Sequence, residues 1–401
     1  MSNLSFMEKL LDGVEVEWKT LGEIAIKISS GGTPSTGVSE YYGGDIPWLR
    51  TQEVDFGNIW DTGVKITEAG LKNSSAKLIP ANCVIVAMYG ATVGKIGINK
   101  IPVSTNQACA NIQLDENTLH YRYVFHYLCS KYENIKSLGA GSQTNINAQI
   151  IKNYLIPIPC PENPKKSLEI QAEIVRILDA FTELTAELTT ELTTELNARK
   201  KQYNHYRDQL LSFDEGEVEW KALGEIAQIN TGQKPSEILD TVNAFDYINA
   251  GTTRSGYAAN SNCEGDTVTT PSRGQGGIGF VGYKKEPFWL GPLCYKMRSL
   301  DNATLINKYL FYFLQSKNDL LLGLKKEGGV PAVNKSDLAK LEIPVPPIGT
   351  QKNIVAILDK FDALTSSITE GLPREIELRQ KQYAYYRDLL LSFPKSDEVA
   401  A

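Results

Sequence analysis

VEWKTLGEIA, at Val16–Ala25, recurs almost unchanged as VEWKALGEIA at Val218–Ala227, and the two copies differ only at Thr20 and Ala222. A repeat of this kind indicates that one structural unit occurs twice along the chain. The 401 residues are enough for two or three domains of ordinary size, so two related domains would account for the length.

A longer repeat pairs Gln171–Phe213 with Gln351–Phe393, and 23 of the 43 aligned positions are identical. Its clearest parts are IVRILDAF against IVAILDKF and KKQYNHYRDQLLSF against QKQYAYYRDLLLSF. A weaker match pairs GSQTNINAQIIKNYLIPIP, from Gly141, with GGVPAVNKSDLAKLEIPVP, from Gly328. The halves diverge between these segments. A duplication kept only for stability would explain the repeat but not its uneven divergence, which favours two different binding surfaces held in one frame.

The long repeated segments are predicted to be helices. Apolar residues follow i, i+3, i+4, i+7 spacing from Ile170 to Leu196, where the run TAEL-TTEL-TTEL places a leucine at every fourth position. The pattern predicts one helix over 168–211, ~66 Å long at ~1.5 Å per residue. A second is expected over about 350–391, with an interruption near Gly371 and Pro373. The apolar stripes predict an antiparallel coiled coil, with pairing to a partner's helix as the alternative.

The polar ends of both helices carry aromatic and arginine side chains. Such residues suit a protein–protein contact, although a solvated helix end is the simpler alternative. The predicted partner-binding residues are Tyr203, Tyr206, Arg207, Tyr383, Tyr386 and Arg387.

The variable blocks are expected to be mixed α/β, because short β-rich runs alternate with glycine-rich turns. We predict strands at Cys83–Met88 and Ile278–Tyr283, and short helices at Tyr121–Lys131 and Lys308–Ser316. The fold class is therefore α+β, with two globular domains joined by two long helices. The expected boundaries are an N-terminal tail packing near the C-terminal helix (1–13), a first domain (14–160), a helix (161–215), a second domain (216–346), a helix (347–393) and a tail (394–401).

The net charge of −6 lies mainly on the predicted helices. Residues 14–160 carry 12 basic and 12 acidic side chains, and residues 216–346 carry 14 of each. Residues 161–215 carry 7 basic and 11 acidic side chains. DNA-binding domains are often basic. A neutral domain can still bind DNA if a few cations face the phosphates, or if a partner supplies the positive field.

The composition predicts an ordinary cytoplasmic globular protein, with 42% hydrophobic and 22% charged residues. No apolar run reaches the ~18 residues of a membrane span, and the N-terminus lacks the pattern of a secretion signal. The six cysteines are scattered, and the three histidines form no metal-ligand spacing with them, so no metal site is expected. The cysteines are Cys83, Cys109, Cys129, Cys160, Cys263 and Cys294.

Matches to catalytic motifs in the chain are incomplete or lack the expected structural context. Residues 274–279 match G-x-G-x-x-G, but no helix is expected to open at these glycines, and Asp55-Phe-Gly57 stands without the other kinase motifs. No P-loop, H-E-x-x-H, G-x-S-x-G or N/D-P-P-Y/F loop occurs. The chain is therefore predicted to carry no catalytic residues and no cofactor.

Polar, glycine-rich loops remain as candidates for contact with a DNA groove, although any one of them could be an ordinary turn. Arginine can bind guanine and asparagine or glutamine can bind adenine, while Ser, Thr, Lys and backbone amides hold phosphates. In the first block the predicted DNA-contact residues are Gly32, Thr33, Ser35, Arg50, Gln52, Tyr89, Thr92, Lys95, Asn106, Gln107, Ser142, Gln143, Thr144 and Asn145. In the second block they are Lys234, Asn249, Thr252, Arg254, Arg273, Gln275, Lys284, Lys325 and Lys326.

Taken together, these motifs resemble the specificity subunits of type I restriction-modification enzymes. The resemblance rests on the repeated VEWK-x-LGEIA, the [IL]-x-IP-[IV]-P segments at 155–159 and 342–346, the repeated Q-x-x-IV-x-ILD-x-F and the tetrads before KKQY. The tetrads look like the IC subgroup in particular. The likeness covers nearly the whole chain.

The resemblance implies two target recognition domains with pseudo-twofold symmetry, each reading one half of a split, asymmetric DNA site. It also implies two modification subunits, which use S-adenosylmethionine and dock along the helices, and restriction subunits, which use ATP and Mg²⁺. Catalysis and cofactors would belong to those partners. Recognition domains of this family diverge too widely for contact residues to be carried over, so the DNA-contact predictions rest on loop chemistry alone. The main alternative is a coiled-coil adaptor with two protein-binding domains and no role in DNA binding.

Overall fold

The computed structural model divides the chain into two compact units. The first comprises Met1–Thr189 and Leu378–Ala401, and the second comprises Thr190–Glu377. The residues that the structure describes are 10–11, 13–139, 145–214, 216–240, 244–274, 276–326, 330–366 and 370–394.

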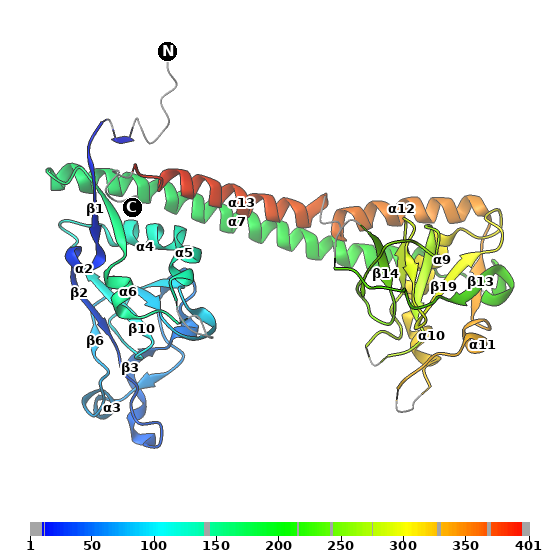
Figure 1. Cartoon of the computed structure of the whole chain (residues 1–401), viewed down its shortest axis with the longest axis horizontal. Helices are drawn as coiled ribbons and strands as arrows, with labels where there is room; N and C mark the ends of the chain where they lie inside the picture. The colour runs from blue at the N-terminus through cyan, green and yellow to red at the C-terminus, as the bar shows by residue number, and fades with distance from the viewer. Residues whose placement is uncertain are drawn as a thin grey trace, which may run out of the picture. The chain divides into compact units, whose positions relative to one another are not determined.

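The described residues of the first unit form three sheets (Figure 1, blue to cyan). Their strand orders are β1-β11, β2-β10-β7-β8-β4 and β5-β3-β9-β6. The strands are β1 Val16–Thr20, β2 Ala25–Ser30, β3 Tyr42–Leu49, β4 Asn58–Ile59, β5 Lys65–Ile66, β6 Leu78–Ile79, β7 Val84–Ala87, β8 Ile96–Asn99, β9 Val103–Thr105, β10 Cys109–Leu114 and β11 Leu155–Pro159. The helices and 3₁₀ turns before the long helix are α2 Leu21–Ile24, η1 Ser39–Tyr41, η2 Thr51–Glu53, α3 Glu68–Lys72, η3 Gly90–Thr92, α4 Tyr121–Ser130, α5 Tyr132–Ser137 and α6 Ala148–Lys152.

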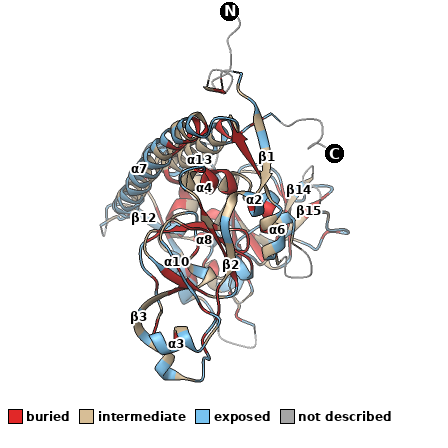
Figure 2. Ribbon diagram, turned by 90° about the vertical axis from the view of Figure 1, so that its left-hand side faces the viewer, coloured by how far each residue is buried: buried red, intermediate tan, exposed pale blue. Residues whose placement is uncertain are grey.

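The core of the first unit joins its largest sheet to α4 and to two helix ends. Every residue of β7 and β8 is buried, as expected for strands covered on both faces. Figure 2 shows α4 largely buried. The same core includes Ile174 and Leu178 from the start of the long helix α7 (Pro164–Leu210), together with Leu391 and Phe393 from just beyond the end of α13 (Gly371–Leu390).

The second unit repeats this plan with strand orders β12-β20, β13-β19-β16-β17 and β15-β14-β18. The strands are β12 Glu219–Ala222, β13 Ala227–Thr231, β14 Phe245–Ile248, β15 Gly256–Ala258, β16 Thr267–Pro271, β17 Gly282–Lys284, β18 Trp289–Leu290, β19 Cys294–Ser299 and β20 Glu342–Val345. The helices are α8 Leu223–Ile226, α9 Asn307–Ser316, α10 Asn318–Gly323, α11 Lys335–Leu338 and α12 Ile348–Ser366. Its core likewise includes Ile354 and Leu358 from the start of α12, and Leu211 from just beyond the end of α7.

The long helices pair in opposite directions. In the first unit Phe181 of α7 lies against Tyr386 of α13, and in the second Tyr203 of α7 lies against Phe361 of α12. Contacts near the start of α7 thus reach the end of the later helical segment, and contacts near its end reach the beginning. The α+β fold with two antiparallel long helices is confirmed.

The predicted interruption of the second helix is also confirmed, because α12 ends at Ser366 and α13 begins at Gly371. Gly371 has φ +78°, and a Cβ there would lie 2.5 Å from the Ala363 carbonyl oxygen, so the break requires glycine.

Both short helices lie where the sequence places them, as α4 and α9, and the strand predicted at Cys83–Met88 appears as β7. The strand predicted at Ile278–Tyr283 is largely wrong. The chain turns through Gly279, at φ +91°, and β17 begins only at Gly282. Glycine permits this left-handed turn, which the alternation of apolar residues does not reveal. Within the described residues no helix combines the length and apolarity of a membrane span.

Candidate nucleic-acid interface

The predicted loops of the first unit meet at two glycines that follow β2. The Gly32 amide donates to the Thr105 carbonyl at 2.9 Å, and Gly32 is buried. A Cβ on Gly31 would lie 1.8 Å from that carbonyl oxygen, and a Cβ on Gly32 would lie 2.5 Å from the Ala76 nitrogen. Glycine therefore lets this loop lie directly on the end of β9. Close by, the Thr33 hydroxyl donates to the Gln107 amide oxygen, joining loop 31–35 to loop 105–107.

Backbone contacts bring the other predicted loops to the same place. The Asn106 amide donates to the Leu49 carbonyl at 2.9 Å, and the Ile146 amide donates to the Met88 carbonyl at 3.0 Å. In addition, the Thr92 hydroxyl donates to the Thr51 carbonyl at 2.8 Å. Residues 31–35, 49–53, 88–95, 105–107 and 145–146 therefore form one surface, which we call the first loop cluster.

The first loop cluster is polar and carries two cations that are already paired. Arg50 lies 3.5 Å from Glu53, and Lys95 Nζ lies 2.7 Å from Asp55 Oδ1. Both pairs remain partly open to solvent, so the cations can exchange a carboxylate for a phosphate. The exposed side chains among the predicted contacts are Thr33, Ser35, Gln52, Tyr89 and Gln107.

Asn106 and Asn145, two predicted DNA contacts of this cluster, each have a side-chain oxygen that faces the protein. Asn106 accepts the Ala108 amide through Oδ1 at 3.2 Å. Asn145 Oδ1 is buried and makes no hydrogen bond among the described residues. Ser142, Gln143 and Thr144 lie outside the described residues, as does Gln275 of the second unit.

The second unit gathers its loops in the same way. The Gly232 amide donates to the Gly291 carbonyl at 3.1 Å, and a Cβ on Gly232 would lie 1.9 Å from the Leu290 carbonyl oxygen. Gly232 therefore repeats the packing of Gly31. Both glycines begin a G-x-x-P-S segment with a buried proline, at 31–35 and 232–236. This short repeat is visible in the sequence, but none of the predictions above rests on it.

Three further contacts complete the second cluster. Asn249 Oδ1 accepts the Leu293 amide at 3.0 Å, and the Ser272 amide donates to the Leu293 carbonyl at 2.9 Å. The Val333 amide donates to the Ser272 carbonyl at 3.0 Å. Residues 232–236, 249–254, 272–274, 290–293, 325–326 and 330–333 form the second loop cluster.

The second loop cluster and its border are richer in cations than the first. Asp246 lies between two of them, 3.2 Å from Arg254 and 2.9 Å from Lys284. Burial alone would raise the pKa of Asp246, but hydrogen bonds and charge from Lys284 and Arg254 hold it below its usual value. Both cations also line a cavity of about 340 Å³ with Thr252. The exposed predicted residues are Lys234, Thr252, Arg254, Arg273, Lys325 and Lys326.

Neither cluster presents an activated nucleophile of the kind that cysteine could supply. Burial raises the pKa of Cys83, Cys109 and Cys294 to about 12, which keeps these thiols protonated. Among the described residues, no group of histidine, cysteine and carboxylate side chains could hold a metal ion.

The predicted partner-binding residues lie on the long helices, where they contact neighbouring side chains. Tyr383 hydrogen bonds Thr182 at 2.9 Å, and Tyr206 stacks on Phe361 at 5.8 Å between ring centroids. Tyr206 and Tyr386 are still 39% and 40% exposed. The two arginines repeat one arrangement, since each pairs with the next aspartate and lies over the tyrosine four residues earlier (Arg207 over Tyr203, Arg387 over Tyr383). Contact with a partner stays a prediction.

The family described as the type I restriction modification DNA specificity domain matches residues 13–198 and 215–378. The chain belongs to this family. It is 38% identical to the EcoR124I/EcoR124II specificity subunit of Escherichia coli, over all of both chains. The chain is therefore a specificity subunit with two DNA-recognition domains. The predicted family and function are confirmed over the adaptor alternative, and the IC subgroup stays a prediction.

Solved structures share the fold at low sequence identity. A chain from a study of complex assembly in the type I restriction-modification system has a TM-score of 0.67 at 18% identity, covering 94% of this chain and 97% of that chain. The HsdS subunit of Thermoanaerobacter tengcongensis has a TM-score of 0.55 at 19% identity, covering 94% and 95%. Both solved chains share the overall fold of this chain.

Proposed function

We propose that each loop cluster reads one half of a bipartite, asymmetric DNA site. The observation that carries this proposal is that two clusters, equivalent in position and built on the same glycine packing, present different side chains. The first offers exposed Gln52 and Gln107, which suit adenine, and the second offers Arg254 and Arg273, which suit guanine. Neighbouring hydroxyls and lysines suit phosphates.

We further propose that catalysis and cofactors belong to partner subunits. Two modification subunits with S-adenosylmethionine would dock along the long helices, and restriction subunits with ATP and Mg²⁺ would join them. The repeated Tyr-x-x-Tyr-Arg segments on α7 and α13 suit two copies of one partner, because the same side chains occur twice. Such a complex would act in the cytoplasm against foreign DNA.

The long helices would set the number of unread base pairs between the half-sites. Helix α7 is continuous over 47 residues and belongs in part to each unit. Each tetrad adds ~6 Å to a helix, comparable with one or two base steps of ~3.4 Å. The three tetrads between 185 and 196 would therefore act as a ruler.

A domain exchange tests the proposal. Residues 14–157 are replaced by the corresponding segment of another specificity subunit, and methylated sites are mapped in cells that carry the full set of partner genes. We expect a new first half-site with the second half-site and the spacer unchanged. The reciprocal exchange of residues 216–344 is the matched control and should change only the second half-site. A change of both half-sites by one exchange would contradict the proposal, and failure of the complex to bind any duplex in a gel shift would favour an adaptor.

A further inference from the structure

A glutamine and an aspartate eight residues apart occur at the start of both long helical segments, as Gln171 and Asp179 in α7 and as Gln351 and Asp359 in α12. Both glutamines are completely buried. A buried amide must find hydrogen-bond partners, and the partners of these two show what the repeated pair holds.

The two glutamines accept hydrogen bonds from equivalent positions in their domains. Gln171 Oε1 accepts the His120 amide at 2.8 Å, and Gln351 Oε1 accepts the Ile306 amide at 2.9 Å. His120 is the N-cap residue of α4, and Ile306 is the N-cap residue of α9. Each glutamine therefore fixes the first turn of one domain helix against one long helix.

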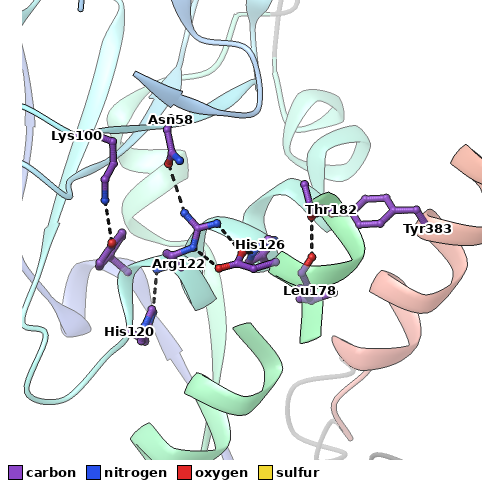
Figure 3. Close-up of polar contacts among 10 residues, drawn as sticks. Asn58, Lys100, His120, Arg122, His126, Leu178, Thr182 and Tyr383 are labelled. Atoms are coloured by element: carbon purple, nitrogen blue, oxygen red, sulfur yellow. Dashed lines mark hydrogen bonds and ion pairs between the residues drawn. The ribbon is translucent and has the colours of Figure 1, made fainter. Parts of the chain in front are cut away.

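The two aspartates bind the first two turns of the same helices, but through different side chains. Asp179 accepts Arg122 Nε at 2.7 Å and lies 2.7 Å from His126 Nε2; Figure 3 shows both side chains converging from α4. Asp359 accepts the Tyr312 hydroxyl at 2.5 Å and lies 3.2 Å from Lys308 Nζ. In both units the donors are spaced i, i+4, so they lie on one face of the helix.

A third matched contact ties each domain helix to the strand that precedes the long helix. The Tyr123 hydroxyl donates to the Pro157 carbonyl at 2.8 Å, and the Tyr309 hydroxyl donates to the Pro344 carbonyl at 3.0 Å. These hydroxyls lie in the cores of the two units. Three matched polar contacts thus surround α4 and α9, although the donors to the aspartates differ.

Each of these domain helices packs on the two strands that flank a loop of its cluster. Helix α4 packs on β7 and β8, which are joined by loop 88–95, and α9 packs on β16 and β17, which are joined by residues 272–281. Packed side chains transmit displacements with little loss, because protein interiors are close-packed. A shift of the domain helix on the long helix therefore displaces the loop.

We propose that the glutamine–aspartate pair is a repeated seat that orients each loop cluster on its long helix, with each aspartate governing recognition of one half-site. The inference rests on the proposed function. The aspartate of the seat supplies only acceptors, so a domain of different sequence fits it if it presents two donors at i, i+4 on this helix. Asp179 and Asp359 are positioning residues that act through α4 and α9.

The test measures half-site discrimination in the complete complex with its partner subunits. The probes are the methylated duplex and duplexes with one base changed in the first or the second half-site. We expect Asp179→Asn to lower discrimination at the first half-site at least about tenfold, the loss of one charge-assisted hydrogen bond, and to leave the second unchanged. Asp359→Asn should do the reverse. Glu173→Gln, whose carboxylate pairs with Arg176 on the same helix, is the control and should discriminate like the wild type.

A double substitution separates positioning from a general loss of structure. Arg122→Lys with His126→Tyr gives the first unit the donor pair of the second, and we expect it to keep discrimination at both half-sites. Where Asp179→Asn prevents assembly, Arg122→Gln replaces it and should give the same selective loss. The proposal is wrong if Asp179→Asn weakens both half-sites equally or neither, or if the double substitution loses as much as Asp179→Asn. A wild-type complex that discriminates at neither half-site would instead overturn the proposed function.

Discussion

The two units carry the same seat beneath different loop clusters. Gln171 and Gln351 make equivalent contacts, and Gly31 and Gly232 pack against equivalent carbonyls. The predicted contacts of the first cluster include two cations, Arg50 and Lys95, whereas those of the second unit include six. The loop clusters differ in their exposed side chains, whereas the glutamine and aspartate that hold each domain on its long helix are the same in both units. The contacts that hold each domain on its long helix can therefore be kept while the side chains of the loop clusters change.

We expect the largest effect from deleting one tetrad, Thr189–Leu192. The deletion shortens α7 and leaves the residues of both loop clusters unchanged. The deletion shortens the helix by ~6 Å and turns it by about 40°. We expect methylation of the original site to be lost and a site with a shorter spacer, but unchanged half-sites, to appear in methylome sequencing. Substituting all four residues by alanine keeps the length and is the control. An unaltered spacer would refute the ruler.

The second-largest effect is expected from substituting Gly31 and Gly232, which tests whether the two turns are equivalent. Gly31→Ala and Gly232→Ala place a Cβ within 2 Å of the Thr105 and Leu290 carbonyl oxygens, so the backbone must move. We expect each to lower the free energy of unfolding by about 3 kcal/mol. Gly37→Ala, with open space around its Cβ, should change it little. Urea denaturation measures all three, and a neutral Gly232→Ala would show that only the first turn is essential.

We expect a smaller effect on DNA binding from removing cations of the second loop cluster. Lys234→Ala and Arg273→Ala each remove one exposed cation, and each should weaken binding to all duplexes and reduce the salt slope of log K by about 0.9 if the side chain neutralises one phosphate. Ser35→Ala in the first cluster should leave the slope unchanged. Arg176→Ala, on α7, is the control for loss of charge. Fluorescence anisotropy across a salt series measures the slopes, and equal slopes for every variant would remove this distinction.

The smallest expected effect is a pH dependence of stability that arises from Asp179 in the seat of the first unit. Burial alone would raise the pKa of Asp179, but hydrogen bonds from His126 and Arg122, with the charge of Arg122, lower it from 3.8 to about 2. A carboxylate with a lowered pKa in the fold stabilises it above the unfolded value, and this stabilisation is lost as pH falls from about 4 to about 2. Because the side chain is about a third exposed, the contribution is on the order of 1 kcal/mol.

Thermal unfolding of wild type and Asp179→Asn at a series of pH values provides the measurement. The difference in Tm should be constant above pH 5 and should shrink below pH 4. Glu173→Gln is again the matched control. A difference that persists unchanged at pH 3 would mean that the carboxylate charge does not hold α4.

Local patterns in the sequence were enough to predict the long helices and helices α4 and α9, and Gly371 with Pro373 predicted the break in the second long helix. It was not enough for β17, since Gly279 turns the chain where apolar residues alternate. Only part of the seat can be predicted from the sequence. Asp179 and Asp359 stand in the repeated ILD-x-F, but their donors differ in type and lie more than 45 residues away in sequence. The loops were chosen individually by composition, and only packing shows that they form two surfaces.

Each long helical stretch begins in the core of one unit and ends in the core of the other. The first unit contains the start of α7 and also Leu391 and Phe393, which are synthesised after the whole second unit. Tyr123, which lies against Phe393 in the folded chain, has no such neighbour while the ribosome is still producing the second unit. Domains usually fold in the order of synthesis. Here the unit whose synthesis starts first is the one completed last, so its core closes only when the C-terminal helix arrives.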